Sequence, residues 1–333
     1  MVKRALASTN VTLIFVLLLV IAFFRILNPY YLGIDNIRSI LNTMSLAGTL
    51  SVGMACLIIG GQINLAAGAE GCFAAILAAL MMQAGVPWPI AMLGAVAFGA
   101  LSGLLTSFLC NTLNFVAFIA TLAMQSVYKG AGMVVTNAQN LPISNQVFWS
   151  IGASTYLGIP APFLIMAALF LIYGFILNNT RFGRRVYMCG GNPNAARLAG
   201  ISTKKMHTVL FINCSAISAF GGVILAATMH SASPNNVFGT EFDAITGAVL
   251  GGIAFTGGKG GLSGCFLGIV LLSCFNNGMV GVGLASFWSL VARGALLVIA
   301  LALDYFRMQH SRKTGQKSGG DRTRYSGSTT APS

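Results

Sequence analysis

Long apolar segments follow one another along almost the whole chain, and they limit the folds that it can adopt. A helix needs roughly 20 mainly apolar residues to cross a bilayer. Ten segments approach this length, near residues 10–28, 37–60, 65–84, 88–109, 115–136, 161–178, 206–228, 242–258, 262–282 and 286–306. Only 8% of the 333 residues are charged, against roughly a quarter in a soluble domain. The sequence therefore predicts an all-α polytopic membrane protein with about ten transmembrane helices.

The basic residues predict how these spans are oriented. Lys and Arg number 19 against 6 Asp and Glu, for a net charge of +13, and they concentrate in 181–205 and 307–324. Loops rich in Lys and Arg stay on the cytoplasmic side, so ten spans with both termini in the cytoplasm fit best. Eight spans with two re-entrant segments satisfy the same rule. We expect a transmembrane domain over 1–306 and a basic, disordered cytoplasmic tail over 307–333.

The residue types needed for catalysis or metal binding do not come together in this sequence. The seven Cys include no C-x-x-C pair, and the three His belong to no catalytic or zinc-binding motif. Gly257-Gly258-Lys259-Gly260 resembles a phosphate-binding loop, but the positions around it do not fit. We therefore expect no enzyme activity, no metal, no cofactor and no ATP hydrolysis on this chain. Nucleic-acid binding is not expected either, because no aromatic residues are interleaved with the basic ones.

A polar, Gly-rich stretch from Gly60 to Gly68 interrupts two of the apolar segments. Gln62 and Asn64 lie within it, and Glu70 follows shortly after it. Irregular backbone at membrane depth persists only where protein buries it or where it lines a wet cavity. Broken helices beside polar side chains are a common way to build a solute site in transport proteins. Gln62, Asn64 and Glu70 are therefore candidates for a solute pathway, and a plain cytoplasmic turn is the alternative.

Other polar side chains inside apolar segments are further candidates for this pathway. Gln125, Asn276 and Asn277 carry amides, which suit the hydroxyl groups of a sugar because they donate and accept. Hydrogen bonds between helices are the competing use of such side chains. Arg293 lies inside the last segment, where an ionisable residue is functional by default. Glu241 is expected at the outer start of the eighth segment and is a candidate partner for Arg293.

The basic segment 179–207 is predicted to form a short helix on the cytoplasmic face. Asn192 can cap this helix, Pro193 suits its first position, and Gly200 can end it. A partner protein could grip a helix of this kind. A charged, solvated loop is the alternative.

Several longer motifs follow one another in this segment and in the region after it. They are Thr180-Arg181-Phe182-Gly183-Arg184, Gly190-Gly191-Asn192, Ala195-Ala196-Arg197-Leu198-Ala199-Gly200-Ile201, Gly239-Thr240-Glu241-Phe242-Asp243-Ala244-Ile245, Val249-Leu250-Gly251-Gly252, Gly257-Gly258-Lys259-Gly260 and Asn276-Asn277-Gly278. In this order they resemble the ribose/simple-sugar permease family of bacterial ABC importers. The resemblance covers most of residues 10–306.

The resemblance implies a place for the chain in a larger assembly. Two permease subunits, identical or different, would lie in the inner membrane of a bacterium. Two ATP-binding cassette subunits would attach inside, and a periplasmic sugar-binding protein would deliver a sugar outside. The residues implied to couple the permease to the ATPase are Gly190, Gly191, Asn192, Ala195, Ala196, Arg197 and Gly200.

One departure from the family pattern leaves the solute open. The family usually has Gly-Ile-Asp-Leu-Ser-Val-Gly at the first break, where this chain reads Gln62-Ile63-Asn64-Leu65-Ala66-Ala67-Gly68. The family's acid is Asn64 here, and we expect Glu70 partly to replace it. A monosaccharide or similar polyhydroxylated solute is favoured; a branched-chain amino acid, a nucleoside or an autoinducer-type solute is the alternative. An ion-coupled secondary carrier would need an acidic relay, to which only Glu70 points.

Overall fold

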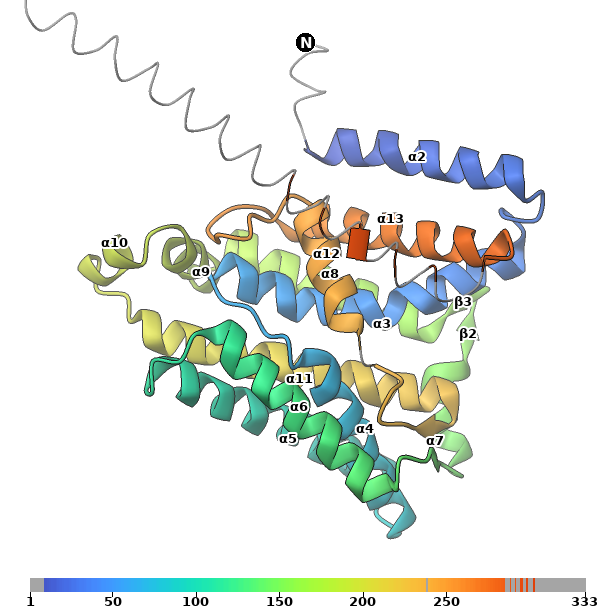
Figure 1. Ribbon diagram of the computed structural model, residues 1–333, viewed down its shortest axis with the longest axis horizontal. Helices are drawn as coiled ribbons and strands as arrows, with labels where there is room; N and C mark the ends of the chain where they lie inside the picture. Colours follow the sequence, from blue (N-terminus) through green and yellow to red (C-terminus); the bar gives the residue numbers. More distant parts are fainter. Residues whose placement is uncertain are drawn as a thin grey trace, which may run out of the picture.

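The chain folds into a bundle of helices in the part that the structure describes. This computed structural model describes residues 9–237 and 239–284, together with Trp288, Val291, Gly294, Ala295, Val298 and Ala302. The helices are α2 (Thr9–Leu27), α3 (Ile34–Ile59), α4 (Ala67–Gln83), α5 (Trp88–Asn111), α6 (Ala117–Thr136), α7 (Gln146–Ala153), α8 (Ala161–Asn179), α9 (Arg181–Gly191), α10 (Pro193–Leu198), α11 (Thr203–Met229), α12 (Thr240–Leu250) and α13 (Leu262–Gly281) (Figure 1). The predicted all-α class is confirmed.

Two pairs of two-residue strands accompany the helices. The strands β1 (Leu141–Pro142) and β4 (Ser231–Ala232) pair antiparallel, as do β2 (Thr155–Tyr156) and β3 (Ile159–Pro160). The backbone N–H of Ile143 donates to the carbonyl oxygen of His230 at 3.0 Å. The ring of Trp149 stacks on that of His230 with centroids 4.4 Å apart. The segment between α6 and α8 is thereby fastened to the end of α11.

Charge distinguishes the two ends of the bundle. The end that carries α9 and α10 is called the basic end, because Arg181, Arg184, Arg185, Lys204 and Lys205 lie there. The opposite end, called the far end, carries α7 and the strands β2 and β3 (Figure 1).

Among the described residues, seven helices are long and apolar enough to cross a membrane: α2, α3, α5, α6, α8, α11 and α13. The chain is therefore a multi-pass membrane protein. The helix α4 has 17 residues and α12 only 11, so the predicted full span over 242–258 is wrong. Glycines end α12: Gly251 caps it, and Gly252 takes a φ of 86°, which glycine adopts without strain. The tenth predicted segment, 286–306, and the tail 307–333 lie outside the described residues, apart from a few single positions.

Small residues let the central helices approach closely. The helices α3 and α11 lie at the centre of the bundle, and α5 packs along α11. A Cβ atom added to Gly103 would lie 2.5 Å from the carbonyl oxygen of Phe211, so only glycine fits there. The same holds where α12 meets α13, because a Cβ on Gly251 would lie 2.4 Å from the backbone nitrogen of Cys265. Close backbone approach through small residues is typical of helix packing in membranes.

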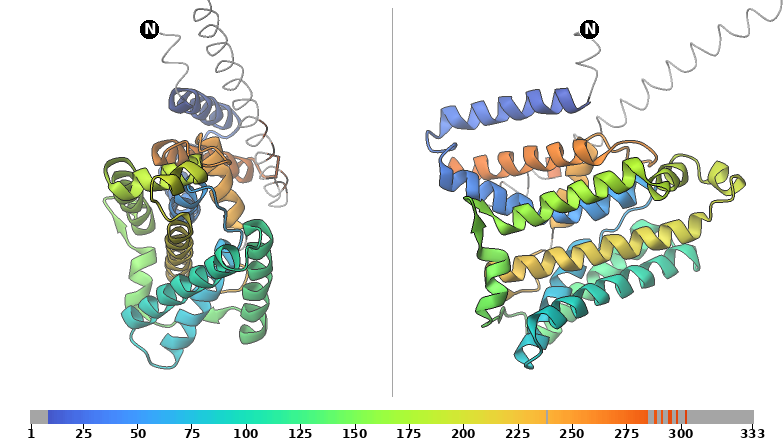
Figure 2. Two further views of the ribbon diagram at one scale, coloured as in Figure 1. Left: turned by 90° about the vertical axis from the view of Figure 1, so that its left-hand side faces the viewer. Right: turned by 180° about the vertical axis from the view of Figure 1, so that it is seen from behind.

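Two stretches of chain turn back into the bundle and start helices in its middle (Figures 1 and 2). These two helices, α4 with 17 residues and α12 with 11, are shorter than the seven spans and are called here the half-length helices. After α3 ends at the basic end, residues 60–66 return to the depth of Ser215, which lies near the middle of α11. The helix α4 then runs to the far end. After α11 ends at the far end, residues 230–237 return; α12 then crosses the bundle, and the loop after it reaches the basic end, where Gly258 contacts Ile59. A Cβ on Gly68 of α4 would lie 1.9 Å from Oε2 of Glu241 in α12, so the two half-length helices begin beside each other.

A full-length helix, a returning stretch and a half-length helix thus occur twice, in opposite directions. Transport proteins often contain such inverted repeats, with the solute site between them and near the middle of the membrane. The prediction of a broken helix at 60–68 is confirmed, and the plain turn is wrong. The second returning stretch, which lies between the predicted spans 206–228 and 242–258, is not predicted from the sequence.

Candidate functional site

Glu70 and Asn64 meet in a buried polar cluster at the start of α4. Glu70 is fully buried; its Oε1 accepts from the hydroxyl of Ser102 at 2.6 Å, and its Oε2 accepts from Nδ2 of Asn64 at 3.0 Å. The same Nδ2 lies 3.2 Å from the hydroxyl oxygen of Ser215. Oδ1 of Asn64 accepts from the backbone N–H of Ala66 at 2.9 Å, which shapes the turn that begins α4. The cluster therefore joins the returning stretch to α5 and α11; that Glu70 replaces the family's acid stays a prediction.

A second buried carboxylate, that of Glu241, lies at the start of α12. Its Oε1 accepts from Nε2 of Gln125 at 2.6 Å, and its Oε2 accepts from the backbone N–H of Gly239 at 2.9 Å. The expectation that Glu241 lies at the outer start of a span is wrong, because residues 230–239 carry it into the bundle. Gln125 contacts this interior carboxylate. The signal in the sequence for this inward stretch is weak: Pro234 and Gly239 bound it.

Both carboxylates lie in the first turn of a half-length helix. A helix start carries a partial positive charge, which stabilises a nearby anion by up to about 2 kcal/mol in partly buried geometry. This field and the hydrogen bonds offset part of the cost of burying a carboxylate. The Glu70 cluster therefore fastens the start of α4 to α5 and α11, and the bond of Glu241 with Gln125 fastens the start of α12 to α6.

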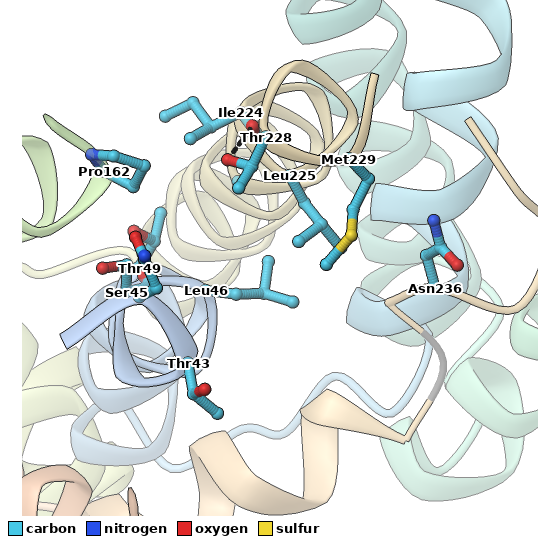
Figure 3. A pocket seen from close by; sticks show the side chains of 12 residues that line it. Thr43, Ser45, Leu46, Thr49, Pro162, Ile224, Leu225, Thr228, Met229 and Asn236 are labelled. Atoms are coloured by element: carbon cyan, nitrogen blue, oxygen red, sulfur yellow. Dashed lines mark hydrogen bonds between the residues drawn. The ribbon is translucent and has the colours of Figure 1, made fainter. Parts of the chain in front are cut away.

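A cavity of about 250 Å³ lies in the far half of the bundle, between α3, α11 and the start of α8 (Figure 3). We call it the α3–α11 cavity. Hydroxyls and amides alternate with apolar side chains in its lining: Asn42, Thr43, Ser45, Leu46, Thr49, Pro162, Gly221, Ile224, Leu225, Thr228, Met229 and Asn236. None of these lining residues is charged.

The hydroxyls of the α3–α11 cavity are arranged to accept hydrogen bonds. That of Ser45 donates to the carbonyl of Leu41 at 2.5 Å, and that of Thr49 donates to the carbonyl of Ser45 at 2.8 Å. Each hydroxyl donates its hydrogen bond to a carbonyl of its own helix, so its lone pairs can accept from a solute. The amides of Asn42 and Asn236 can donate. The sequence predictions do not include this cavity. The spacing of Ser45 and Thr49, four residues apart on one helix face, is the signal for it.

A second cavity, of about 270 Å³, lies on the other side of α3, against α12 and α13. We call it the α3–α13 cavity. Asn276 and Asn277 line it together with Asp243, and Thr43 lines both cavities. The Oδ1 atoms of Asn276 and Asn277 are buried and have no hydrogen-bond partner among the described residues. Both oxygens are therefore available to a solute that donates hydrogen bonds.

The predicted pathway residues lie in three places rather than in one pocket. Asn64 and Glu70 form the first cluster, Gln125 belongs to the second, and the asparagine pair lines the α3–α13 cavity. Gln62 is half-buried in the returning stretch and lines neither cavity. Arg293 lies outside the described residues.

At the basic end, α9 and α10 form the short helical segment that the sequence predicts. Oδ1 of Asn192 accepts from the backbone N–H groups of Asn194 and Ala195, at 3.1 and 3.0 Å. Pro193 takes the first position of α10, and Gly200 beyond its end has a φ of 78°. The capped helix is confirmed, and the alternative of an unstructured loop is wrong.

Three backbone segments meet at glycines where α9 ends. The backbone N–H of Gly258 donates to the carbonyl oxygen of Ile59 at 2.8 Å. A Cβ on Gly190 would lie 1.8 Å from that carbonyl oxygen and 2.7 Å from the nitrogen of Gly258. We call the contact of Gly190, Ile59 and Gly258 the glycine junction. Because Ile59 ends α3 and Gly258 follows α12, a movement of α9 would act on the segment that leads to α4 and on the loop that follows α12.

Comparison with known proteins identifies what kind of protein has this arrangement. Residues 36–301 match the family described as the permease component of branched-chain amino acid transport systems. The chain belongs to this family. The permease is therefore a transport protein, and the family indicated by its sequence motifs is confirmed.

Curated relatives match the permease over nearly its whole length. It is 34% identical to the probable ABC transporter permease protein YphD of Escherichia coli (strain K12), over 91% of this chain and 92% of that protein. It is also 34% identical to the ribose import permease protein RbsC of Bacillus subtilis (strain 168), over 87% and 90%. The D-allose transport system permease protein AlsC of Escherichia coli (strain K12) is 32% identical, over 87% and 90%. All three are named as permeases.

Proposed function

We propose that this permease is the transmembrane subunit of an ATP-binding cassette importer for a monosaccharide or a similar polyhydroxylated solute. The α3–α11 cavity carries the proposal, because its lining is uncharged and rich in hydroxyls and amides. Its volume of about 250 Å³ is below the roughly 300–1,000 Å³ of drug-sized pockets, which favours a single sugar ring. Relatives named for ribose and D-allose support this solute class.

Transport would proceed by alternating access along the inverted repeats. The solute enters at the far end, binds between α3 and α11, and passes the starts of α4 and α12 on its way to the basic end. The clusters around Glu70 and Glu241 fasten these starts to α5, α11 and α6, so their hydrogen bonds would rearrange when the bundle opens. Rocking of one repeat against the other is the general way in which such folds expose a central site to alternate sides.

The energy for this movement would come from separate subunits. Two ATP-binding cassette subunits dock on α9 and α10 at the basic end, and the glycine junction conducts their movement to both repeats. The basic residues around α9 favour a cytoplasmic position for this end in the bacterial inner membrane, with both chain termini in the cytoplasm. A second permease subunit lies alongside, and a periplasmic sugar-binding protein delivers the solute at the far end.

The alternative solute is a branched-chain amino acid, and one observation favours it. Asp243 in the α3–α13 cavity is a carboxylate that could bind an ammonium group. Among the described residues, the lining of that cavity offers no basic residue for the solute's own carboxylate. We therefore keep the sugar as the proposed solute.

Uptake into proteoliposomes tests both parts of the proposal. The permease is reconstituted with its ATP-binding subunits and binding protein, and uptake of labelled ribose and allose is measured with and without ATP. We expect uptake that needs both ATP and the binding protein. Uptake driven by a proton gradient alone would overturn the importer, and leucine as the better competitor would overturn the sugar.

A further inference from the structure

A pocket of about 620 Å³ lies at the basic end, where α5 ends and α11 begins. Its lining includes two cationic side chains, Arg197 and Lys204, with the imidazole of His207 and the amides of Asn111 and Asn114. We propose that this pocket, called here the phosphate pocket, binds the phosphate group of an anionic phospholipid from the adjoining leaflet.

The charge of the phosphate pocket is not balanced from within the described part of the chain. The acidic residues of this part are Asp35, Glu70, Glu241 and Asp243. Asp35 lies at the far end, where it pairs with Arg38, and the other three are buried in the bundle. No ion pair of Arg197 or Lys204 with a described residue exists. The positive charge of Arg197 and Lys204, which are both exposed, is therefore available to a ligand with negative charge.

Neutral donors add to these charges. The first turn of α11 lines the pocket through Thr203 and Lys204, and the first N–H groups of a helix have no partner within it. Phosphate binds readily to such N–H groups and to the partial positive charge at a helix start. The imidazole of His207 is hydrogen-bonded to the backbone of Gly60, but its Nε2 atom is buried and has no hydrogen-bond partner among the described residues. This orphaned atom is a place where a bound ligand completes the hydrogen bonding.

Position favours a lipid over a soluble anion or an acidic side chain of another protein. The pocket lies at the ends of two membrane-spanning helices, which is the level of the lipid headgroups. The chain next to Asn114 is apolar and exposed: Leu113, Phe115 and Val116 are 48%, 53% and 64% exposed. Acyl chains can cover these side chains while the phosphate lies in the pocket. Basic pockets between transmembrane helices on the cytoplasmic side bind anionic headgroups in this way.

Native mass spectrometry of the purified full-length permease tests the proposal. Wild type, Lys204→Ala and Lys205→Ala are each mixed with equal amounts of phosphatidylglycerol and phosphatidylcholine. Lys205 is exposed in the same helical turn but does not line the pocket, so its variant is the matched control. We expect wild type and Lys205→Ala to retain phosphatidylglycerol preferentially. Loss of one cation beside the headgroup should lower its retention about fivefold in Lys204→Ala.

A second measurement separates the sources of phosphate and guards against misfolding. Phosphatidylglycerol should raise the midpoint temperature of thermal unfolding in wild type but not in Lys204→Ala. Inorganic phosphate alone should raise it in neither protein. Equal retention in all three proteins, or equal retention of phosphatidylcholine, would show the proposal to be wrong. So would stabilisation by inorganic phosphate as large as by the lipid. If Lys204→Ala keeps its lipid but loses the ATP-binding subunits on co-purification, the pocket is a protein contact instead. None of these outcomes depends on which solute is transported.

Discussion

The carboxylate of Glu70 accepts hydrogen bonds from two directions, from Ser102 on α5 and from Asn64 on the returning stretch. Both donors are on different elements, so one side chain holds three segments in register. A charged acceptor strengthens each of these bonds relative to a neutral one. The residue therefore anchors the returning stretch to α5, and we predict that it also takes over the role of the acid that the family usually has at the position of Asn64.

Glu70→Gln should slow transport without unfolding the permease. The amide keeps the shape of the side chain but loses its charge, and hydrogen bonds to charged groups are worth about 1 kcal/mol more than neutral ones. We expect the initial rate of uptake in proteoliposomes to fall by about fivefold to tenfold. Asp35→Asn, at an exposed carboxylate of the far end, is the control and should transport normally. Normal uptake by Glu70→Gln at full expression would remove the role given to its charge.

Thr49→Val should weaken solute binding in the α3–α11 cavity. Valine fills the same volume but lacks the lone pairs with which the hydroxyl of Thr49 accepts from a sugar. One neutral hydrogen bond is worth roughly 0.5–1.5 kcal/mol, so the apparent KM for uptake should rise about twofold to tenfold. The control is Thr136→Val on α6, where a buried hydroxyl donates only to the carbonyl of Gly132. An unchanged KM in Thr49→Val would place the solute elsewhere.

At the scale of elements, the glycine junction brings the backbone of α9 against both repeats. Backbone contacts of this kind are stiff, because no side chain can rotate out of the way. The end of α3 and the loop after α12 therefore respond together when α9 moves.

Gly190→Ala should uncouple ATP hydrolysis from transport. The added methyl group would lie 1.8 Å from the carbonyl oxygen of Ile59, so α9 must separate from α3. We expect the assembled transporter to hydrolyse ATP while uptake per ATP falls several-fold. Gly191→Ala is the matched control, since its methyl group meets only the Cα of Gly258, at the ordinary distance of 3.7 Å. Equal coupling ratios in the two variants would contradict the junction's role, whereas loss of ATPase subunits would instead indicate failed docking.

The same elements show what the sequence could and could not reveal. The break at 60–68 was predictable, because Gly and amides interrupt an apolar run there. The returning stretch 230–239 was not, since hydropathy reports the composition of a segment and not its depth. The residues after it are as apolar as a full span, so a half-length helix looks like the start of a longer one. The hydroxyls on α3 could not be singled out from the sequence either, because Ser and Thr are common in any membrane helix.

For the whole molecule, the docking of ATPase subunits depends on whether the basic end faces the cytoplasm. Leu198→Cys on α10 and Leu157→Cys at the far end replace side chains that are 91% and 103% exposed. A membrane-impermeant maleimide should label the far-end cysteine in intact cells and the other only after the membrane is broken. Native Cys189 should interfere little, because burial raises the pKa of its thiol and lowers its reactivity. The reverse labelling pattern would invert the topology and remove the cytoplasmic docking of ATPase subunits.

The strand pair β1–β4 and the stacked rings of Trp149 and His230 connect the surface of the far end to the returning stretch after α11. The segment around β1 contacts residues 230–232, which lie at the start of the stretch that returns from the end of α11 into the bundle. We propose that a binding protein docked on this surface would act on the start of α12 through the stretch that begins at residue 231. Delivery of the solute at the far end and release of the hydrogen bond between Gln125 and Glu241 would then be coupled.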